Sequence, residues 1–240
     1  GSISAASWRP SVDSPPGVLF GSLAYRRTAL DDEVRALLEV DDDGLEFLLP
    51  ATTGLPSRAS LSIVVDERSR LRGLDTLRLL MLRLLLSIPP GKVQFTLIDP
   101  VGLGENFAGF MHLEDERPGL VGERIWTERP QIEQRLVNLT ETMETVIQKY
   151  LRNEFDSIEA YNEVAGEIAE PYRFLVVSDF PQGFSEEAVR RLTSVLRSGP
   201  RCGVFTLLLH DRKATFPETF DPAVLEETSL HLRLDGDRTT

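Results

Sequence analysis

The sequence predicts an α/β fold: a mostly parallel sheet with helices on both faces, preceded by a small N-terminal flanking element. Two observations support this prediction. Apolar segments of strand length alternate with longer segments in which apolar residues recur every three or four positions, and glycine- and proline-containing turns separate them. Such alternation is typical of parallel strands connected by helices that cover the sheet.

Residues 3–58 form the predicted flanking element. They begin with a segment rich in proline and serine and continue with strand-like runs at 18–20 and 45–49. Between these runs, two aspartates precede a short helix-like segment, so a helix is expected at 31–38. Residues 1 and 2 (Gly-Ser) begin the chain without an initiator methionine, and we interpret them as a cloning scar.

Residues 59–240 form the predicted main domain. Strands are expected at 61–65, 93–98, 172–177, 203–209 and 230–234, the last at a sheet edge, and helices at 71–87, 129–155 and 185–197. Ser185 is the expected N-cap of the third helix. One face of the second helix is apolar, with Ile132, Leu136, Leu139, Met143, Ile147 and Leu151. We expect this face to pack on the sheet, and a coiled-coil partner face is the alternative.

Composition limits the classes of function. Hydrophobic residues make up 41% of the 240 residues and charged residues 27%, so the chain can bury a sizeable core. The single cysteine, Cys202, excludes an intrachain disulfide and a cysteine zinc cluster and suits the cytoplasm. The net charge of −12 disfavours nucleic-acid binding by this chain alone, because phosphate binders present a basic face. The most apolar segment, 74–88, is too short to span a bilayer.

Candidate sites follow four of the predicted strands. In an open α/β sheet, ligands bind beyond the carboxyl ends of the strands. These ends are the turn after Val65, the corner at Asp99, the corner at Asp179, and the pair His210 and Asp211. No metal site is predicted, because the other histidines lack ligand-like spacing to a carboxylate pair.

The turn after the first strand of the main domain stands where a phosphate-binding loop would lie. Such a loop needs G-x-x-x-x-G-K-[ST], in which backbone N–H groups surround the phosphates and the lysine neutralises their charge. Here the turn reads DERSRLRGL, with Gly73 as its only glycine and without a lysine. A functional phosphate loop is therefore not expected. Arg68, Arg70 and Arg72 remain candidate phosphate ligands, because a guanidinium binds phosphate through its planar fork.

The other corners offer incomplete catalytic sets. A nucleotide hydrolase would hold a magnesium-binding Asp and a water-activating Glu at the end of such a strand, whereas the corner VSDFP (177–181) has only Asp179. A capping role is the alternative for this residue. His210 and Asp211 resemble half of a catalytic pair, but neither G-x-S-x-G nor H-E-x-x-H occurs in the sequence. A structural or sensor-like cluster is the alternative there.

The order of these parts resembles the motor core of the FtsK/SpoIIIE DNA translocases, which are RecA-like P-loop ATPases. The resemblance is carried by the strand, phosphate-loop position and helix at 61–87, VQFTLIDPVGLG (93–104), FMHL (110–113), IQKYLRNEFDSIEAYN (147–162), YRFLVVSDF (172–180) and SGPRCGVFTLLLHD (198–211). It covers about residues 60–235 and implies a RecA-like fold for 59–240. The type VII secretion ATPases share this core.

When the chain is matched to this family, it lacks the characteristic residues of the family's nucleotide-binding motifs. The family's phosphate-binding Gly-Lys-Ser falls near Arg72, Gly73 and Leu74, where none of its chemistry is kept. The family's Asp-Glu pair falls on Ser178 and Asp179, so at least one carboxylate is missing. The resemblance therefore implies a degenerate member that retains the scaffold.

Three further positions match the family. Asp99 matches the aspartate of its Asp-Pro corner. Arg201 lies near the position where some members present an arginine to the site of a neighbouring subunit. The family's sensor residue falls on His210 or Asp211.

Three functions remain open from the sequence. The first is a non-hydrolysing assembly or regulatory module of a larger DNA-translocase-like protein, with other FtsK-like domains or subunits as partners and with DNA bound by the parent assembly. The second is an ATP-binding motor domain in which the arginine turn replaces the lysine and Asp99 and Asp179 hold Mg²⁺. The third is an unrelated α/β enzyme that uses His210 and Asp211. A cofactor, ATP with Mg²⁺, is expected only under the second.

Overall fold

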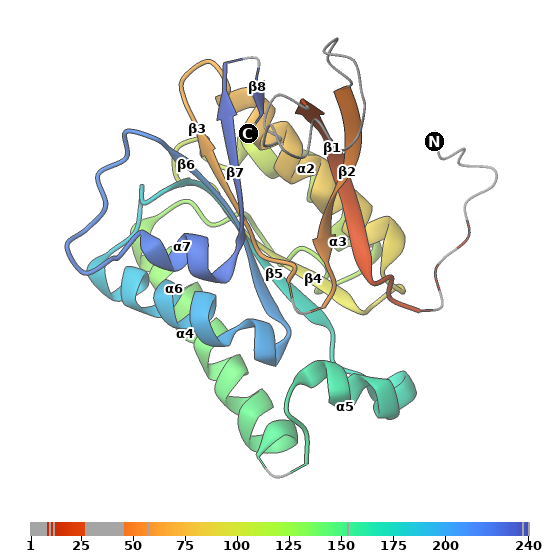
Figure 1. The fold of residues 1–240 in the computed structure, drawn as a ribbon. Helices are drawn as coiled ribbons and strands as arrows, with labels where there is room; N and C mark the ends of the chain where they lie inside the picture. Colours follow the sequence, from red (N-terminus) through yellow and green to blue (C-terminus); the bar gives the residue numbers. More distant parts are fainter. Residues whose placement is uncertain are drawn as a thin grey trace.

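The main sheet confirms the predicted fold class. The computed structural model describes residues 9, 11, 13–26, 46–56, 58–152, 154–236 and 238–239. In this part of the chain a six-stranded sheet has the order β4-β5-β6-β3-β7-β8, in which the first five strands are parallel and β8 is antiparallel to β7 (Figure 1). The strands are β3 (Leu61–Val65), β4 (Val93–Ile98), β5 (Tyr172–Phe180), β6 (Val204–Asp211), β7 (Leu230–Asp235) and β8 (Arg238–Thr239).

Helices cover both faces of this sheet. Helix α2 (Arg70–Ser87) packs against β3 and β6 on one face. On the other face α6 (Glu186–Ser198) packs against β6, α7 (Ala223–Thr228) against β7, and α4 (Arg129–Val146) along α6 (Figure 1). The strands β3 and β6 are therefore covered on both sides, which explains their nearly continuous apolar sequences.

The flanking element is an antiparallel hairpin of β1 (Gly17–Arg26) and β2 (Glu46–Gly54). It packs on α2, and the side chains of Val18, Phe20 and Ala51 belong to the same buried core as the main sheet. The two predicted strands are thus present and longer than predicted. The interpreted scar at residues 1–2 and the helix expected at 31–38 lie outside the described residues.

The prediction of a single helix over residues 129–155 was wrong in length. Helix α4 ends at Val146 and continues as a π-helical turn, Ile147–Leu151. A π turn spaces equivalent positions five residues apart, which keeps both Val146 and Leu151 in the core. A separate helix α5 (Ile158–Ala165) then begins at Ser157, whose hydroxyl accepts a hydrogen bond from the N–H of Ala160.

The other expected caps and faces agree with the structure. Ser185 caps α6 by accepting a hydrogen bond from the N–H of Ala188 at 3.0 Å. The apolar face of α4 is buried as predicted, at Ile132, Leu136, Leu139 and Met143. Short helices complete the described part: η2 (Glu105–Phe110), α3 (His112–Glu116), η4 (Gly166–Ile168) and η5 (Pro200–Cys202). A search of the described residues found no helix that is both long and apolar enough to cross a membrane.

Candidate functional site

Most of the predicted site residues lie at one edge of the sheet. The turn after β3, Asp99 after β4, Asp179 near the end of β5, and His210 and Asp211 at the end of β6 all stand at the carboxyl edge of the parallel strands. A cleft of about 650 Å³ opens there, with Asp179, Asp211 and Lys213 in its wall. These candidates therefore lie together at the carboxyl edge, as the strand pattern predicted.

The turn at the phosphate-loop position is closed by hydrogen bonds between its own residues. The carboxylate of Asp66 accepts hydrogen bonds from the backbone N–H of Ser69 at 2.8 Å and from its hydroxyl at 2.6 Å. The N–H of Asp66 donates in return to the Ser69 oxygen at 2.9 Å, and this buried hydroxyl also lies 2.7 Å from the carbonyl oxygen of Leu234. Two of the N–H groups that a phosphate loop would direct at its ligand are thus occupied by side chains of the turn.

The same contacts set the acidity of Asp66. The hydrogen bonds from the Ser69 hydroxyl and then from its N–H lower the pKa of Asp66 from 3.8 to about 2. Because the folded-state pKa lies below the unfolded value, this stabilisation is present above about pH 4 and is lost as the pH falls towards about 2. The turn is therefore held by an ionised Asp66 at neutral pH.

We expect the Ser69→Ala substitution to raise the pKa of Asp66 towards 3.8, because it removes the largest of the lowering contacts and leaves the backbone donors in place. Titration of the Asp66 carboxyl carbon by NMR measures this directly. Ser185→Ala, which removes a helix-capping hydroxyl elsewhere, is the control and should leave the Asp66 titration unchanged. A pKa that stayed near 2 in Ser69→Ala would show that the hydroxyl does not set it.

Arg70 and Asp179 form a two-bond ion pair across the site. The guanidinium of Arg70 donates from Nε to Oδ1 of Asp179 at 2.7 Å and from Nη2 to Oδ2 at 2.6 Å. The Asp179 side chain is 14% exposed, and this contact raises the pKa of Arg70. Asp179 itself has a φ of 55°, a left-handed conformation that is uncommon for a residue other than glycine. The pair connects the turn after β3 to the end of β5, where the resemblance places the family's carboxylates.

The remaining residues of the arginine turn have different surroundings. Arg72 donates from Nη2 to the carbonyl oxygen of Gly236 at 2.5 Å, while Arg68 is exposed. Gly73 is a packing glycine: a Cβ there would lie 2.6 Å from Leu209 Cδ1 and 2.7 Å from Val65 Cγ1. Its lack of a side chain lets α2 approach the sheet closely. This close packing is enough to explain why residue 73 is a glycine, without a role in phosphate binding.

Asp99 organises the loop that follows β4. Its fully buried carboxylate accepts hydrogen bonds from five donors: the N–H groups of Gly102, Gly104 and Asn106, the Asn106 amide, and the hydroxyl of Ser178. A Cβ on Gly102 would lie 2.2 Å from the Asn106 amide nitrogen, so a glycine is required there. The candidate magnesium ligand thus has both oxygens occupied by protein donors.

His210 belongs to an aromatic cluster. Its side chain is buried, its ring meets that of Phe216 edge-on at 5.4 Å, and its Nε2 has no hydrogen-bond partner among the described residues. Burial lowers the pKa of His210, which favours the neutral imidazole. Its Nδ1 lies 3.2 Å from the backbone oxygen of Asp211, whose carboxylate instead accepts from the N–H of Lys213 at 2.6 Å. The two side chains are therefore not arranged as a catalytic pair.

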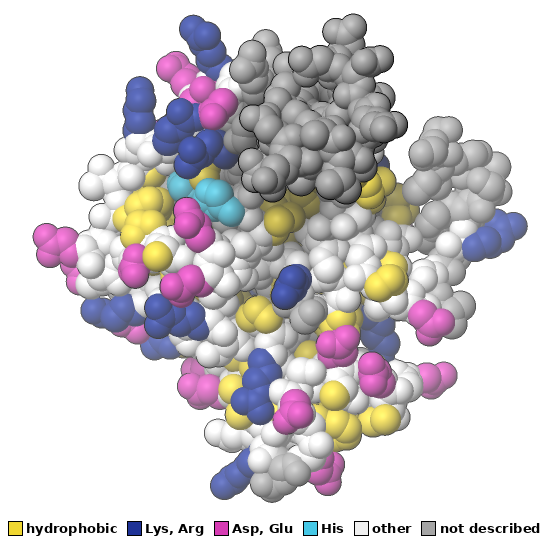
Figure 2. Space-filling view, in the orientation of Figure 1, with side chains coloured by type: hydrophobic (Ala, Val, Ile, Leu, Met, Phe, Trp, Pro, Cys, Tyr) yellow, Lys and Arg dark blue, Asp and Glu magenta, His cyan; other side chains and the backbone are white. Residues whose placement is uncertain are grey.

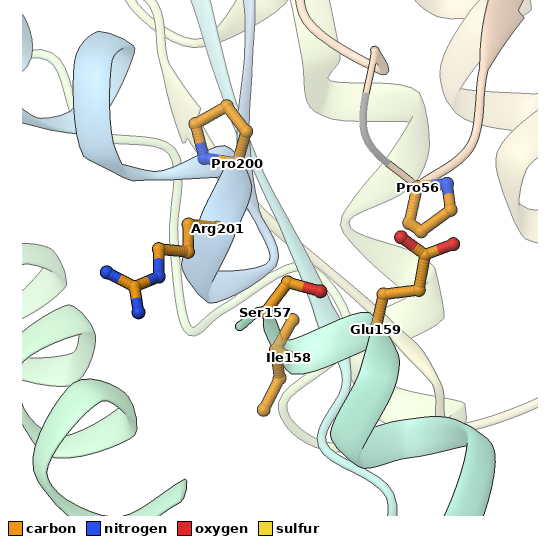
Figure 3. Close-up of a pocket in the computed structure, with 6 residues that line it drawn as sticks. All are labelled: Pro56, Ser157, Ile158, Glu159, Pro200 and Arg201. Carbon is orange, nitrogen blue, oxygen red and sulfur yellow. The ribbon is translucent and has the colours of Figure 1, made fainter. Parts of the chain in front are cut away.

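Arg201 lies at the opposite edge of the sheet. It stands in η5, before β6, and donates from Nε to the carbonyl oxygen of Asp156 at 2.6 Å. Figure 3 shows it beside a small pocket of about 180 Å³ that Ser157, Ile158 and Glu159 also line. The structure thus separates Arg201 from the other candidates.

Several residues that define the site were missed from the sequence. Ser69 stands three residues after Asp66, a spacing typical of side chains that close a turn, and this signal was available. Ser178 was named only as the place of a lost carboxylate, and its contact with Asp99, like that of Asn106, is found only through the fold. Phe216 and Phe220 fold the segment after β6 back onto Phe180, and we see no pattern in the sequence that predicts it.

Comparisons with known proteins agree with this fold. No protein-family model and no curated protein sequence matches the chain. Among solved structures, it is similar to ATPases 2 and 3 of Thermomonospora curvata EccC in complex with a signal sequence peptide (19% identity, TM-score 0.66, 94% of this chain and 39% of that chain). It is also similar to the cytoplasmic domain of the T. curvata type VII secretion ATPase EccC (17%, 0.67, 96% and 24%). A third is the pCW3 conjugation coupling protein TcpA with ATPγS (14%, 0.59, 85% and 56%).

These likenesses confirm the predicted class of fold. The chain has the RecA-like α/β fold found in FtsK/SpoIIIE-type ATPase domains, with an added antiparallel hairpin. It spans between 24% and 56% of the length of these three structures, so each of them contains more than the part that it matches. At 14–19% identity, the similarity concerns the fold.

Proposed function

We propose that this chain is a non-hydrolysing FtsK-like domain that acts as an assembly or regulatory module within a larger ATPase protein. The observation that supports it most is the ion pair of Arg70 and Asp179. In an active ATPase these two places hold the phosphate-binding loop and the catalytic carboxylates, and ligand phosphates and Mg²⁺ lie between them. Here two protein side chains neutralise each other across that space.

The phosphate-loop turn supports the same proposal. Its sequence lacks the lysine and the glycine pair, and the N–H groups of Asp66 and Ser69 are bonded within the turn. A phosphate entering this turn would meet the ionised carboxylate of Asp66 and the exposed Glu67. Both would repel it, and neither is compensated by a backbone cradle.

The places for Mg²⁺ are also occupied. Asp99 is saturated by five donors, Asp179 is paired with Arg70, and Ser178 stands where the family has a carboxylate. Mg²⁺ prefers carboxylate oxygens together with substrate phosphates and retains several waters. A bound ion would have to break existing contacts to obtain these ligands.

We further propose that the domain works beside other FtsK-like domains or subunits in the cytoplasm. Its structural neighbours are parts of longer chains, which fits a module of a larger assembly. Arg201, at the amino edge, is then available to a neighbour's site. We assign DNA binding to the parent protein and not to this chain, since this chain has a net charge of −12.

The two other functions receive less support. An arginine-based ATP site would need Arg70 and Arg72, which are bonded to Asp179 and to the Gly236 carbonyl. An enzyme based on His210 and Asp211 would need their side chains to be hydrogen-bonded to each other, whereas the contact runs through the Asp211 backbone.

A turnover measurement tests the proposed function. We expect phosphate release from Mg-ATP by the purified chain to equal the buffer rate, with or without duplex DNA, because the turn at 66–69 is hydrogen-bonded within itself and Arg70 is paired with Asp179. We also expect no mobility shift of duplex DNA at physiological salt. The Asp179→Asn variant is the control and should behave identically. DNA-stimulated turnover that disappears in Asp179→Asn would instead identify an active motor domain.

A further inference from the structure

A large groove lies at the amino edge of the sheet, opposite the candidate site. It has a volume of about 750 Å³ and runs between the N-terminal segment at 13–16, the turns at Pro56 and Pro89, and helix α5. Its apolar surface comes from Pro15, Pro16, Leu55 and Tyr172 together with those two prolines. A cavity with an apolar lining and this size can accept the side chains of a short peptide.

The rim of the groove is acidic. Asp13, Glu159, Glu163 and Glu167 line it, and within the described part of the chain none of these four forms an ion pair. The single lysine of the groove, Lys92, directs its ammonium at the carbonyl oxygens of Glu167 and Ala169, each at 2.7 Å. A fifth acid, Glu170, is already bonded to Arg173 and Tyr150.

Two of the rim carboxylates repel each other. Glu159 and Glu163 stand four residues apart on α5, a spacing at which like charges destabilise a helix. Burial, and then the charge of Glu163, raise the pKa of Glu159. In Figure 3 the Glu159 carboxylate points towards Pro56, which also lines the groove, while Arg201 extends away from it. A cation placed between the two carboxylates would relieve this repulsion.

The outer surface of α5 and of the turn after it is partly apolar. Val164 is 72% exposed and Ile168 is 74% exposed, next to the acidic rim. Figure 2 shows acidic and hydrophobic side chains gathered over α5, at the lower right of the view. The chemistry that complements this surface is a chain with basic side chains beside apolar ones.

We propose that this groove is a docking site for a basic, partly apolar peptide segment of a partner protein. Arginine or lysine side chains of that segment pair with Glu159, Glu163 and Glu167, and its apolar side chains lie against the prolines, Leu55 and Tyr172 that line the groove. Both the charge complementarity and the apolar lining are needed for this assignment. The proposal concerns the opposite edge of the sheet and does not depend on whether the phosphate site is lost.

The test uses three labelled peptides and the 240-residue chain. The first peptide alternates arginine with leucine, the second replaces arginine by glutamate, and the third replaces leucine by serine. We expect the first to bind by fluorescence anisotropy and the other two to bind at least about tenfold more weakly. The affinity of the first should fall as salt is raised, because the rim charges are partly exposed.

Paired variants locate the site. The double variant Glu159→Gln with Glu163→Gln should lower the affinity for the arginine–leucine peptide by about tenfold or more. It should not lower the melting temperature, because it removes a repulsive pair of charges. Glu226→Gln with Glu227→Gln on α7 makes the same charge change on exposed residues far from the groove and should have no effect. Equal binding of all three peptides, absence of binding, or equal effects of the two double variants would each overturn the proposal. None of these outcomes bears on nucleotide binding.

Discussion

Replacing Asp99 by alanine is expected to lower the free energy of unfolding by about 3 to 5 kcal/mol, because a buried carboxylate that accepts five hydrogen bonds leaves several donors unpaired when it is removed. Three of these donors are backbone N–H groups of one loop, so the loop at 102–106 should also lose its conformation. Chemical denaturation monitored by circular dichroism measures the change, and amide exchange at Gly104 measures the loop.

The Ser178→Ala substitution provides a graded comparison for Asp99. It removes one of the five donors and leaves the carboxylate with the other four, so we expect a loss of only about 1 kcal/mol. If Asp99→Ala cost no more than Ser178→Ala, the carboxylate would not be organising the loop. Asp99 would then be available as a ligand, and added Mg²⁺ should stabilise the wild-type chain.

The second large effect is expected at Arg70. Arg70→Ala leaves the Asp179 carboxylate, with its side chain 14% exposed, without its partner, and should destabilise the fold by about 2 kcal/mol. The loss is measured as a shift in the denaturation midpoint. Arg68→Ala is the matched control, because Arg68 is exposed and should change stability little.

A double-mutant cycle isolates the pair from other effects. Asp179→Asn keeps a residue type that tolerates a φ of 55°, so the backbone conformation is retained. Combined with Arg70→Ala, it should show a coupling of about 1 to 2 kcal/mol between the two sites. A coupling near zero would mean that the two side chains act independently, and the space between them would be open to a ligand.

Much of the fold could be predicted because buried parallel strands have continuous apolar sequences. Strand β3 was predicted with its observed bounds and β6 within two residues of its ends. The end of α4 was missed because residues 147–155 keep a helical pattern and contain neither proline nor glycine. The π turn that follows Val146 places Leu151 in the core, and a sequence pattern does not report such a tertiary contact.

The candidate site was predictable in position and much less in its contacts. The carboxyl ends of parallel strands meet at one edge, so Asp99, Asp179 and His210 could be placed together from the strand pattern alone. Their partners could not be found in this way. Arg70 and Asp179 are 109 residues apart, and their pairing depends on the intervening strand β6 and on the reach of the arginine side chain.

The central claim is that the nucleotide site is closed by its own side chains, and calorimetric titration with Mg-ATP and its non-hydrolysable analogue tests it most directly. We predict no binding heat for the wild-type chain up to millimolar nucleotide, because the turn at 66–69 is hydrogen-bonded within itself and Arg70 is paired with Asp179. Micromolar binding that is lost in Arg70→Ala would contradict the claim and show that the arginine turn is a phosphate site.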